Sequence, residues 1–206
     1  MNPVSEKIAE LKQLPELAMI LDRLEKEMIE EAHRRNEFYE LIHENVKAEF
    51  INGSIVYHSP VMRRHWKVSM KVSKFLATHV DNNDLGEVGV EKVMISLTRN
   101  DYEPDIVFFS KEKSKLFTKE QMHFPEPDLV VEILSDSTAK NDRDIKFRDY
   151  ATHGVKEYWI IDADKSTLEQ YINTDNEFQL VHLFTEGVLK TETVKGFELD
   201  VRAVFE

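Results

Sequence analysis

Two acidic residues on neighbouring hydrophobic segments have the strongest chemical signal in this chain. Asp105 directly follows Pro104 and opens an apolar strand, so a rigid sheet can hold its carboxylate at the strand end. Glu132 lies inside the apolar run from Leu129 to Leu134, where a charge is costly unless something compensates it. A divalent cation is an economical partner for two such acids. A structural alternative is that Asp105 accepts hydrogen bonds in a turn and Glu132 pairs with an arginine.

Lys146 is the third candidate, and it falls on the helix predicted to follow that strand. Asp142 lies one turn before it and Tyr150 one turn after it, all on one face. The ammonium could orient an attacking water and offset charge on a phosphate. Two strand-borne acids with a nearby lysine are what a metal-dependent phosphodiester hydrolase needs. A surface ion pair between Lys146 and Asp142 has the same spacing, so both interpretations stay open.

The composition sets limits on this hypothesis. The 206 residues fit one α/β or α+β domain with a terminal extension. The net charge of −12 repels nucleic acid over most of the surface, which counts against a general DNA-binding protein. A nuclease stays possible, because some of the acid would sit in the metal site and one basic stripe suffices for phosphate contacts. With no cysteine, thiolate ligands are excluded and magnesium or manganese is favoured.

The sequence gives no sign of a membrane partner or of export. No window approaches the roughly 18 apolar residues needed for a membrane span. The amino terminus lacks the basic-then-apolar secretory pattern. We therefore expect a cytoplasmic protein with no membrane partner.

The first 45 residues predict helices. No glycine occurs there, and Pro15 is expected to separate a short helix from a longer one. Apolar side chains recur at 4, 3 and 4 residues on the longer helix, at Leu17, Leu21, Leu24 and Met28. This stripe favours packing against the protein's own domain. Contact with a second copy, as a homodimer, or with another partner is the alternative.

The rest of the chain alternates predicted strands and helices. Asn52-Gly53 predicts a tight β-hairpin between the strands 46–51 and 54–58. The other elements expected are a helix after Pro60 to about residue 80, strands at 87–97, 104–109 and 129–134, a helix at 141–153, and strands at 158–162, 168–172, 179–184 and 189–194, then a tail.

At this point the residues resemble a known family, the Uma family of restriction endonuclease-like proteins within the PD-(D/E)xK nuclease superfamily. The matching residues are Pro104-Asp105, Pro127-Asp128-Leu-Val-Val-Glu132-Ile-Leu-Ser135, Ser137-Thr138, Asp142, Lys146, Tyr150, Gly154-Val155, Glu157-Tyr158-Trp159 and Asp162. The upstream run Glu49-Phe-Ile-Asn-Gly53-Ser-Ile-Val56, with Ser59-Pro60 and His65, also looks like that family's opening hairpin and helix. The resemblance covers roughly Phe38 to the carboxyl terminus.

The resemblance implies an α/β fold with a restriction-endonuclease-like core, a central mixed sheet flanked by helices. We expect this domain at residues 46–206, with a helical extension at 1–45 and β-hairpins near the carboxyl terminus. By position, Asp105 looks like the superfamily's motif aspartate and Glu132 like the acid of its (D/E)xK element. Two residues after Glu132 stands Leu134 instead of lysine. Lys146 is expected to supply the missing ammonium.

Three further residues, Glu49, Asp128 and His65, could have either a functional or a structural role. Glu49 matches an acid before the hairpin turn and is a possible third magnesium ligand, or else a solvated carboxylate. Asp128 stands at the start of its strand and is expected to cap or turn the chain. His65 shares a helix face with Val72 and Leu76, so a structural histidine is favoured over a metal ligand.

A basic stripe follows another face of the same predicted helix. It consists of Arg63, Lys67, Lys71 and Lys74, at spacings of 4, 4 and 3. On an acidic protein such a stripe could contact DNA phosphates, although a solvated lysine-rich face explains it as well. Trp66 and Met70 lie between the two faces and are expected to pack.

The sequence therefore predicts a magnesium-dependent or manganese-dependent DNA endonuclease. Asp105, Glu132 and Lys146 would be its catalytic residues, and Asp105, Glu132 and Glu49 its metal ligands. Two alternatives stay open: a nuclease fold that binds or regulates without catalysis, and an interaction protein that works through its amino-terminal helices.

Overall fold

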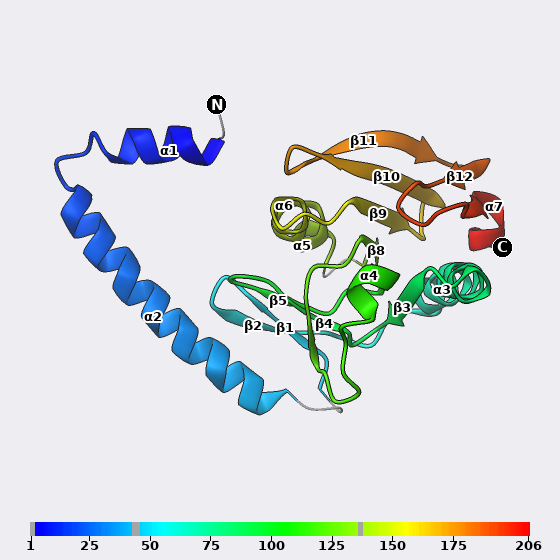
Figure 1. The fold of residues 1–206 in the computed structure, drawn as a ribbon, viewed down its shortest axis with the longest axis horizontal. Helices are drawn as coiled ribbons and strands as arrows, with labels where there is room; N and C mark the ends of the chain where they lie inside the picture. Colours follow the sequence, from blue (N-terminus) through cyan, green and yellow to red (C-terminus); the bar gives the residue numbers. More distant parts are fainter. Residues whose placement is uncertain (1–2, 43–45, 136–137) are drawn as a thin grey trace.

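The structure is a computed structural model that describes residues 3–42, 46–135 and 138–206; Ser137 lies outside these ranges. Two helices open the chain, α1 (Pro3–Leu11) and α2 (Leu17–Leu41), and Pro15 lies in the turn between them. Figure 1 shows α2 standing beside the rest of the molecule with α1 at its far end. The predicted pair of amino-terminal helices is therefore present.

A five-stranded sheet follows, with the strand order β2-β1-β5-β4-β7. Its first two strands form the predicted hairpin, in which Asn52 and Gly53 have φ angles of 47° and 80°. Two positive φ values in succession make the tight turn that Asn-Gly favours. The strands are β1 (Ala48–Ile51), β2 (Ser54–Tyr57), β4 (Met94–Ser96), β5 (Asp101–Tyr102) and β7 (His123–Phe124).

A six-stranded mixed sheet forms the centre of the molecule, with the order β11-β10-β9-β8-β6-β3. β8 runs parallel to β9, and its pairing with β6 is antiparallel. The strands are β3 (Gly86–Val90), β6 (Ile106–Ser110), β8 (Leu129–Ile133), β9 (Glu157–Asp162), β10 (Thr167–Thr174) and β11 (Glu177–Phe184). β10 and β11 form a hairpin near the carboxyl terminus, as expected.

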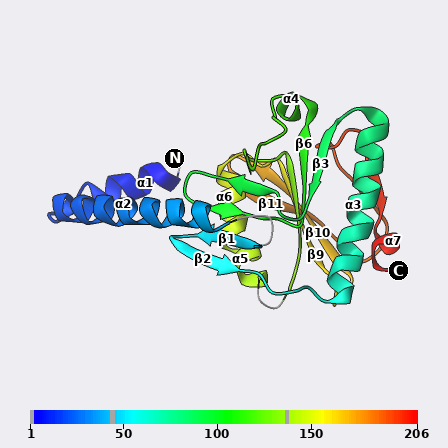
Figure 2. The same ribbon diagram turned by 90° about the horizontal axis from the view of Figure 1, so that it is seen from below.

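Helices cover both faces of this sheet. Figure 2 shows α3 (Arg63–Asn83) on one side and α6 (Ile145–Thr152) with the five-stranded sheet on the other. The buried residues of α3 recur every four positions, as in Val68, Val72, Leu76 and Val80, which gives the helix one apolar face. The remaining elements are α4 (Lys111–Ser114), α5 (Ala139–Arg143), β12 (Val188–Lys190), β13 (Glu198–Asp200) and α7 (Val201–Phe205).

The alternation along β8 explains how an acid enters the interior. Leu129, Val131 and Ile133 belong to the core cluster beneath α3, whereas Val130 belongs to the cluster on the opposite face. Successive strand residues point to opposite faces. Glu132 therefore shares the face of Val130, toward α6 and the five-stranded sheet.

Three predicted segments differ from the structure. The strand expected at 87–97 is two strands, β3 and β4, because Glu91 and Lys92 both have positive φ angles between them. The helix expected at 141–153 is broken by the irregular backbone of Asp144 into α5 and α6. The expected tail contains β13 and α7.

Only the carboxyl-terminal part of α2 packs on the domain, and the stripe Leu17, Leu21, Leu24 and Met28 lies in its other half. Phe38, near the end of α2, is fully buried in a cluster with Phe50 and Met94. Leu21, Leu24 and Met28 are 54%, 45% and 68% exposed, so the prediction that their stripe packs against the domain is wrong for this half of α2. A domain boundary at residue 45 stays a prediction, and Phe38 already belongs to the core.

None of the described helices is both long enough and apolar enough to span a membrane. The predicted cytoplasmic location stays a prediction.

Candidate active site

Asp105 and Glu132 are cross-strand neighbours. Ile106 pairs with Val131 in the antiparallel ladder between β6 and β8, so Asp105 stands opposite Glu132 one step further along. The backbone N–H of Asp105 donates to Glu132 Oε2 at 3.3 Å, and the N–H of Ile133 donates to Asp105 Oδ2 at 2.8 Å. Like charges in this relationship destabilise a sheet. The arrangement is therefore one that packing alone does not favour.

Lys146 lies in the interior, next to Glu132. Its Nζ donates to Glu132 Oε1 at 2.9 Å, and Glu49 Oε1 lies 2.8 Å away. Asp142 Oδ1 forms a further ion pair at 3.3 Å. Lys146 is only 2% exposed, which excludes the surface pair with Asp142 as an explanation of the spacing. Glu132 pairs with this lysine, and not with the arginine that the structural alternative required.

The strand β1 brings Glu49 to the same ammonium. Glu49 is 1% exposed, its Oε1 accepts from the N–H of Glu103 at 2.9 Å, and its Oε2 lies 3.4 Å from His58 Nε2. Glu49 contacts Lys146 and does not line the cavity described below, so its predicted role as a metal ligand stays a prediction.

The buried carboxyl groups of Glu132, Asp142 and Glu49 outnumber the positive charges beside them, and their pKa values are shifted in different directions. Burial raises the pKa of Glu132 well above its usual value, and Asp142 and Asp105 add to this effect while Lys146 opposes it. Burial likewise raises the pKa of Asp142. For Glu49 burial acts in the same direction, but Lys146 and His58 outweigh it and lower the pKa to about 2. Strongly shifted carboxylates in one cluster are typical of functional sites.

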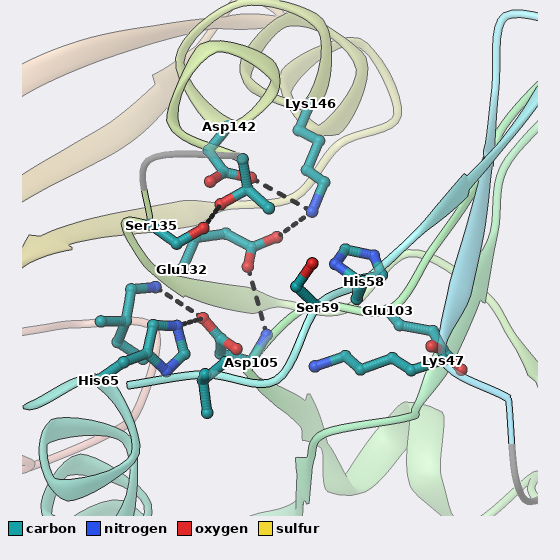
Figure 3. A pocket seen from close by; sticks show the side chains of 13 residues that line it. Lys47, His58, Ser59, His65, Glu103, Asp105, Glu132, Ser135, Asp142 and Lys146 are labelled. Atoms are coloured by element: carbon teal, nitrogen blue, oxygen red, sulfur yellow. Dashed lines mark hydrogen bonds and ion pairs between the residues drawn. The ribbon is translucent and has the colours of Figure 1, made fainter. Parts of the chain in front are cut away.

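A cavity of about 40 Å³ opens beside this cluster, and Asp105 and Glu132 both line it. A volume of that size holds a water molecule or a small ion. Figure 3 shows carboxylates of the two strands meeting there, with Lys146 above and His65 at the side. The other residues that line the cavity are Lys47, His58, Ser59, Val61, Glu103, Ile133, Ser135, Thr138 and Asp142.

His65 holds Asp105 from the helix α3. Its Nε2 lies 3.3 Å from Asp105 Oδ2, and the residue is 8% exposed. Burial lowers the pKa of His65, but the Asp105 carboxylate outweighs burial and raises it. This contact agrees with the structural histidine favoured from the sequence, although its partner is a candidate site residue.

Asp128 has a structural environment. Its Oδ2 accepts from the N–H of Ser110 at 2.7 Å, and its Oδ1 lies 2.8 Å from Lys156 Nζ. It does not line the cavity. Asp128 therefore ties β8 to the end of β6, as expected for a residue that turns the chain.

The basic stripe on α3 is not gathered at the cavity. Lys71 Nζ donates to the carbonyl of Ala203 at 3.0 Å, and Lys74 is exposed. Arg63, Lys67 and Lys71 instead line a hollow of about 300 Å³ beside α7. A DNA contact by this stripe stays a prediction. Trp66 and Met70 are 45% and 61% exposed, so the prediction that they pack is wrong.

Lys47 and His58 line the cavity but were not identified from the sequence. They flank the predicted hairpin, and the N–H of His58 donates to the carbonyl of Lys47 at 3.1 Å. Residues two apart on a strand share a face. Once Glu49 is a candidate, the same alternation places Lys47 beside it, and this signal was available in the sequence.

The donor chemistry around the cavity suits a hard divalent cation. Magnesium is commonly bound through one or two carboxylates, with waters and substrate phosphates completing its shell. Asp105 and Glu132 meet that requirement. Within the three described ranges no group of three or more His, Asp or Glu side chains is arranged to hold a metal ion. The residues therefore fit an ion held by two carboxylates rather than one held in a full protein cage.

The mixed sheet, its helices and the buried acids define a nuclease-like fold of the restriction-endonuclease type. A crystal structure of a putative nuclease belonging to DUF820 from Anabaena variabilis superposes with a TM-score of 0.71, covering 82% of this chain and 96% of that one. The two sequences are 18% identical, so this likeness concerns the fold alone.

Residues 35–202 match the model of the Uma2 family, described as a putative restriction endonuclease, and the chain belongs to that family. Two uncharacterized proteins of Synechocystis sp. are also similar. One is 27% identical over 145 residues, covering 68% of this chain and 81% of the relative. The other is 29% identical over 160 residues, covering 75% and 82%. The family matched is the one that the sequence motifs resemble.

Proposed function

We propose that this protein is a metal-dependent endonuclease that hydrolyses phosphodiester bonds in DNA. The observation that carries the proposal is the cross-strand pair Asp105 and Glu132, whose carboxylates line one cavity. Membership of a family described as a putative restriction endonuclease supports the same reaction class and substrate.

The reaction adds water across one P–O bond. The water oxygen bonds to phosphorus, the bond to the leaving oxygen breaks, and the proton released by the water balances the proton gained by the leaving oxygen. A magnesium or manganese ion, when bound, polarises the phosphate and lowers the pKa of a bound water. Asp105 and Glu132 are the residues that would hold this ion.

The surrounding residues of the chain fix these two acids in place. His65 and the N–H of Ile133 both contact Asp105 Oδ2. Lys146 contacts Glu132 and joins it to Glu49 and Asp142, which come from other elements. We therefore expect Lys146 to contribute to catalysis by keeping the Glu132 carboxylate oriented. The gain in rate would come from this preorganisation of the site.

The test is cleavage of supercoiled plasmid and of single-stranded DNA with magnesium or manganese. Asp105→Asn and Glu132→Gln are expected to lower the rate by at least about 100-fold, the size of effect seen for key electrostatic groups. Glu157→Gln is the matched control, since Glu157 is a buried acid on β9 held by Trp159 and Gln170. Equal nicking by the wild type and both site variants would remove the hypothesis.

A nuclease fold that binds without cleaving is the second candidate. The observation that favours it is the limited ligand set, two carboxylates with no third ligand side chain arranged around an ion in the described residues. Calorimetric titration with manganese separates the two candidates. Millimolar or tighter binding that Asp105→Asn abolishes supports the metal-dependent enzyme, and no binding supports the non-catalytic module.

A homodimer through the amino-terminal helices is proposed in addition. Apart from Met19, on another side of α2, and Leu41, at its end, seven large apolar side chains in this part are between 37% and 68% exposed: Ile8, Leu11, Leu14, Leu21, Leu24, Met28 and Ile29. Their exposed surface is on the order of 700 Å², close to the area that each partner buries in a standard interface. A second copy, which carries the same surface, is the partner proposed.

A further inference from the structure

The charge around Lys146 is already balanced by acids of the protein itself. Its ammonium has three carboxylate oxygens within 3.3 Å, from Glu49, Glu132 and Asp142, and it is 2% exposed. An ammonium has three N–H donors. One positive charge among three acids leaves the cluster negative or protonated. A phosphate that enters the cavity therefore gains little attraction from Lys146.

Lys47 is the other lysine of the cavity, and its surroundings differ. It stands immediately before β1 and is half-buried, and Figure 3 shows its side chain directed toward the cavity from the side of Glu103. Within the described part of the chain its Nζ forms no hydrogen bond and no ion pair within 4 Å. Its charge still acts on the site: burial raises the pKa of Glu103 and Lys47 opposes that rise. For Asp105, burial is outweighed by His65 and the Ile133 N–H, and Lys47 adds to this lowering of the pKa. The other titratable groups that line the same cavity are Glu103, Asp105, Glu132, Asp142, Lys146, His58 and His65.

We propose that Lys47 is the cation that contacts the scissile phosphate, and that Lys146 is a positioning residue for the buried acids. This inference rests on the proposed nuclease function and assigns its phosphate-facing residue. A flexible ammonium at the edge of a small cavity can follow charge that develops on the phosphate oxygens. A fully buried ammonium held by acids from three elements cannot do so without breaking those contacts.

The two roles predict opposite patterns in variants of the full-length protein. Lys47→Met is expected to keep the melting temperature of the wild type, because no ion pair is lost. It should bind manganese at least as tightly, because a positive charge near the acids is removed. Its kcat for DNA cleavage should fall at least about 100-fold. Lys47→Arg, which keeps the charge, is expected to recover at least a tenth of the wild-type rate. Lys146→Met is expected to lower the melting temperature, since it leaves three acids without their cation.

Lys195→Met is the matched control. Lys195 is exposed, and its carbonyl accepts from His79, fourteen residues along α3 from His65. That separation is about 21 Å at 1.5 Å per helical residue. The control tests whether loss of any lysine from an acidic protein weakens its encounter with DNA, and its kcat is expected to be unchanged.

The decisive second readout is binding of a fluorescent oligonucleotide with calcium in place of magnesium, which does not depend on cleavage. Lys47→Met should weaken binding about tenfold and flatten the salt dependence by about one phosphate contact. If the wild type and a folded Lys47→Met have equal DNA affinity and equal kcat, the inference about Lys47 is overturned and the proposed function stands. The same holds if Lys47→Met is fully active while a folded Lys146→Arg is inactive. A wild type that neither cleaves nor binds DNA overturns the proposed function and this inference with it.

Discussion

The Nζ of Lys146 lies 2.9 Å from Oε1 of Glu132, and the two residues are fourteen positions apart on a strand and on the second helix after it. The contact takes place in the interior, where each residue is at most 5% exposed in its side chain.

Removal of the buried ammonium is predicted to destabilise the fold strongly. Lys146→Met should lower the free energy of unfolding by about 3–5 kcal/mol, because breaking a buried pair leaves uncompensated charge. Urea denaturation followed by circular dichroism measures this. Adding Glu49→Gln to Lys146→Met should restore part of the loss, since one of the three stranded acids is then neutral. A loss below about 1 kcal/mol would contradict the burial of the charge.

A divalent ion is predicted to stabilise the folded protein. At a manganese concentration 100 times the Kd, binding to the native state alone adds about 2.7 kcal/mol, and the melting temperature rises with concentration. Asp105→Asn should abolish this rise in scanning calorimetry. Glu157→Gln, which changes a buried acid away from the cavity, should keep it. A rise of the same size in Asp105→Asn would place the ion elsewhere.

The ion pair between His153 and Asp149 predicts a pH window of extra stability. The Asp149 carboxylate raises the pKa of His153, and burial lowers that pKa to a smaller extent. Burial raises the pKa of Asp149, but His153, Asn100 and Tyr102 outweigh it and hold the pKa below the usual 3.8. The stability that protonated His153 contributes is fully present below 6.5, its pKa in the unfolded chain, and is lost as the pH rises through its higher pKa in the folded protein. The stability that the Asp149 carboxylate contributes is present above 3.8 and is lost as the pH falls through its lower pKa in the folded protein.

His153→Gln should therefore cost most stability near pH 5.5 and less near pH 8.5. The difference is about 0.5 kcal/mol, because the pair is partly exposed and screened. His33→Gln, at an exposed position on α2, is the control and should show no such pH dependence. Denaturation curves at the two pH values measure the effect, and a larger loss at pH 8.5 would reverse its sign.

The exposed apolar stripe on α2 is predicted to hold the homodimer. Leu21→Glu combined with Leu24→Glu should convert a dimer into a monomer in light scattering, because two charges would be buried in the contact. Met19→Glu is the control, since Met19 is 74% exposed but lies on another side of the helix. A monomeric wild type, or a dimer that survives both substitutions, would dismiss this surface as the contact.

Much of the fold could be predicted because local patterns and tertiary packing agree. The apolar run of β8, the Asn52-Gly53 turn and the buried stripe of α3 each have a spacing that fits one kind of element. The break at Asp144 and the turn at Glu91 and Lys92 were not predicted. In both cases ordinary residues adopt unusual backbone angles that their residue types do not indicate.

The candidate site also contains some residues that could be predicted from the sequence and others that could not. Asp105 and Glu132 were found because a charge in an apolar strand is unusual in itself. Lys47 was missed because nothing unusual surrounds it in the sequence, and only the register of a hairpin brings it to the cavity. The exposure of Trp66 and of the α2 stripe was also missed, since periodicity shows that residues share a face but not what covers that face.

The position of the lysine on α6 has a consequence for how such sites are detected. Leu134 stands where a lysine two residues beyond the acid would be, and it packs in the core. Lys146 instead comes from α6, which Tyr150 and Ala151 anchor in the core because both are buried. A pattern search that demands a fixed spacing between acid and lysine passes over this chain. The fold supplies the proximity that such a search takes from spacing, because a strand and a separate helix bring Glu132 and Lys146 together.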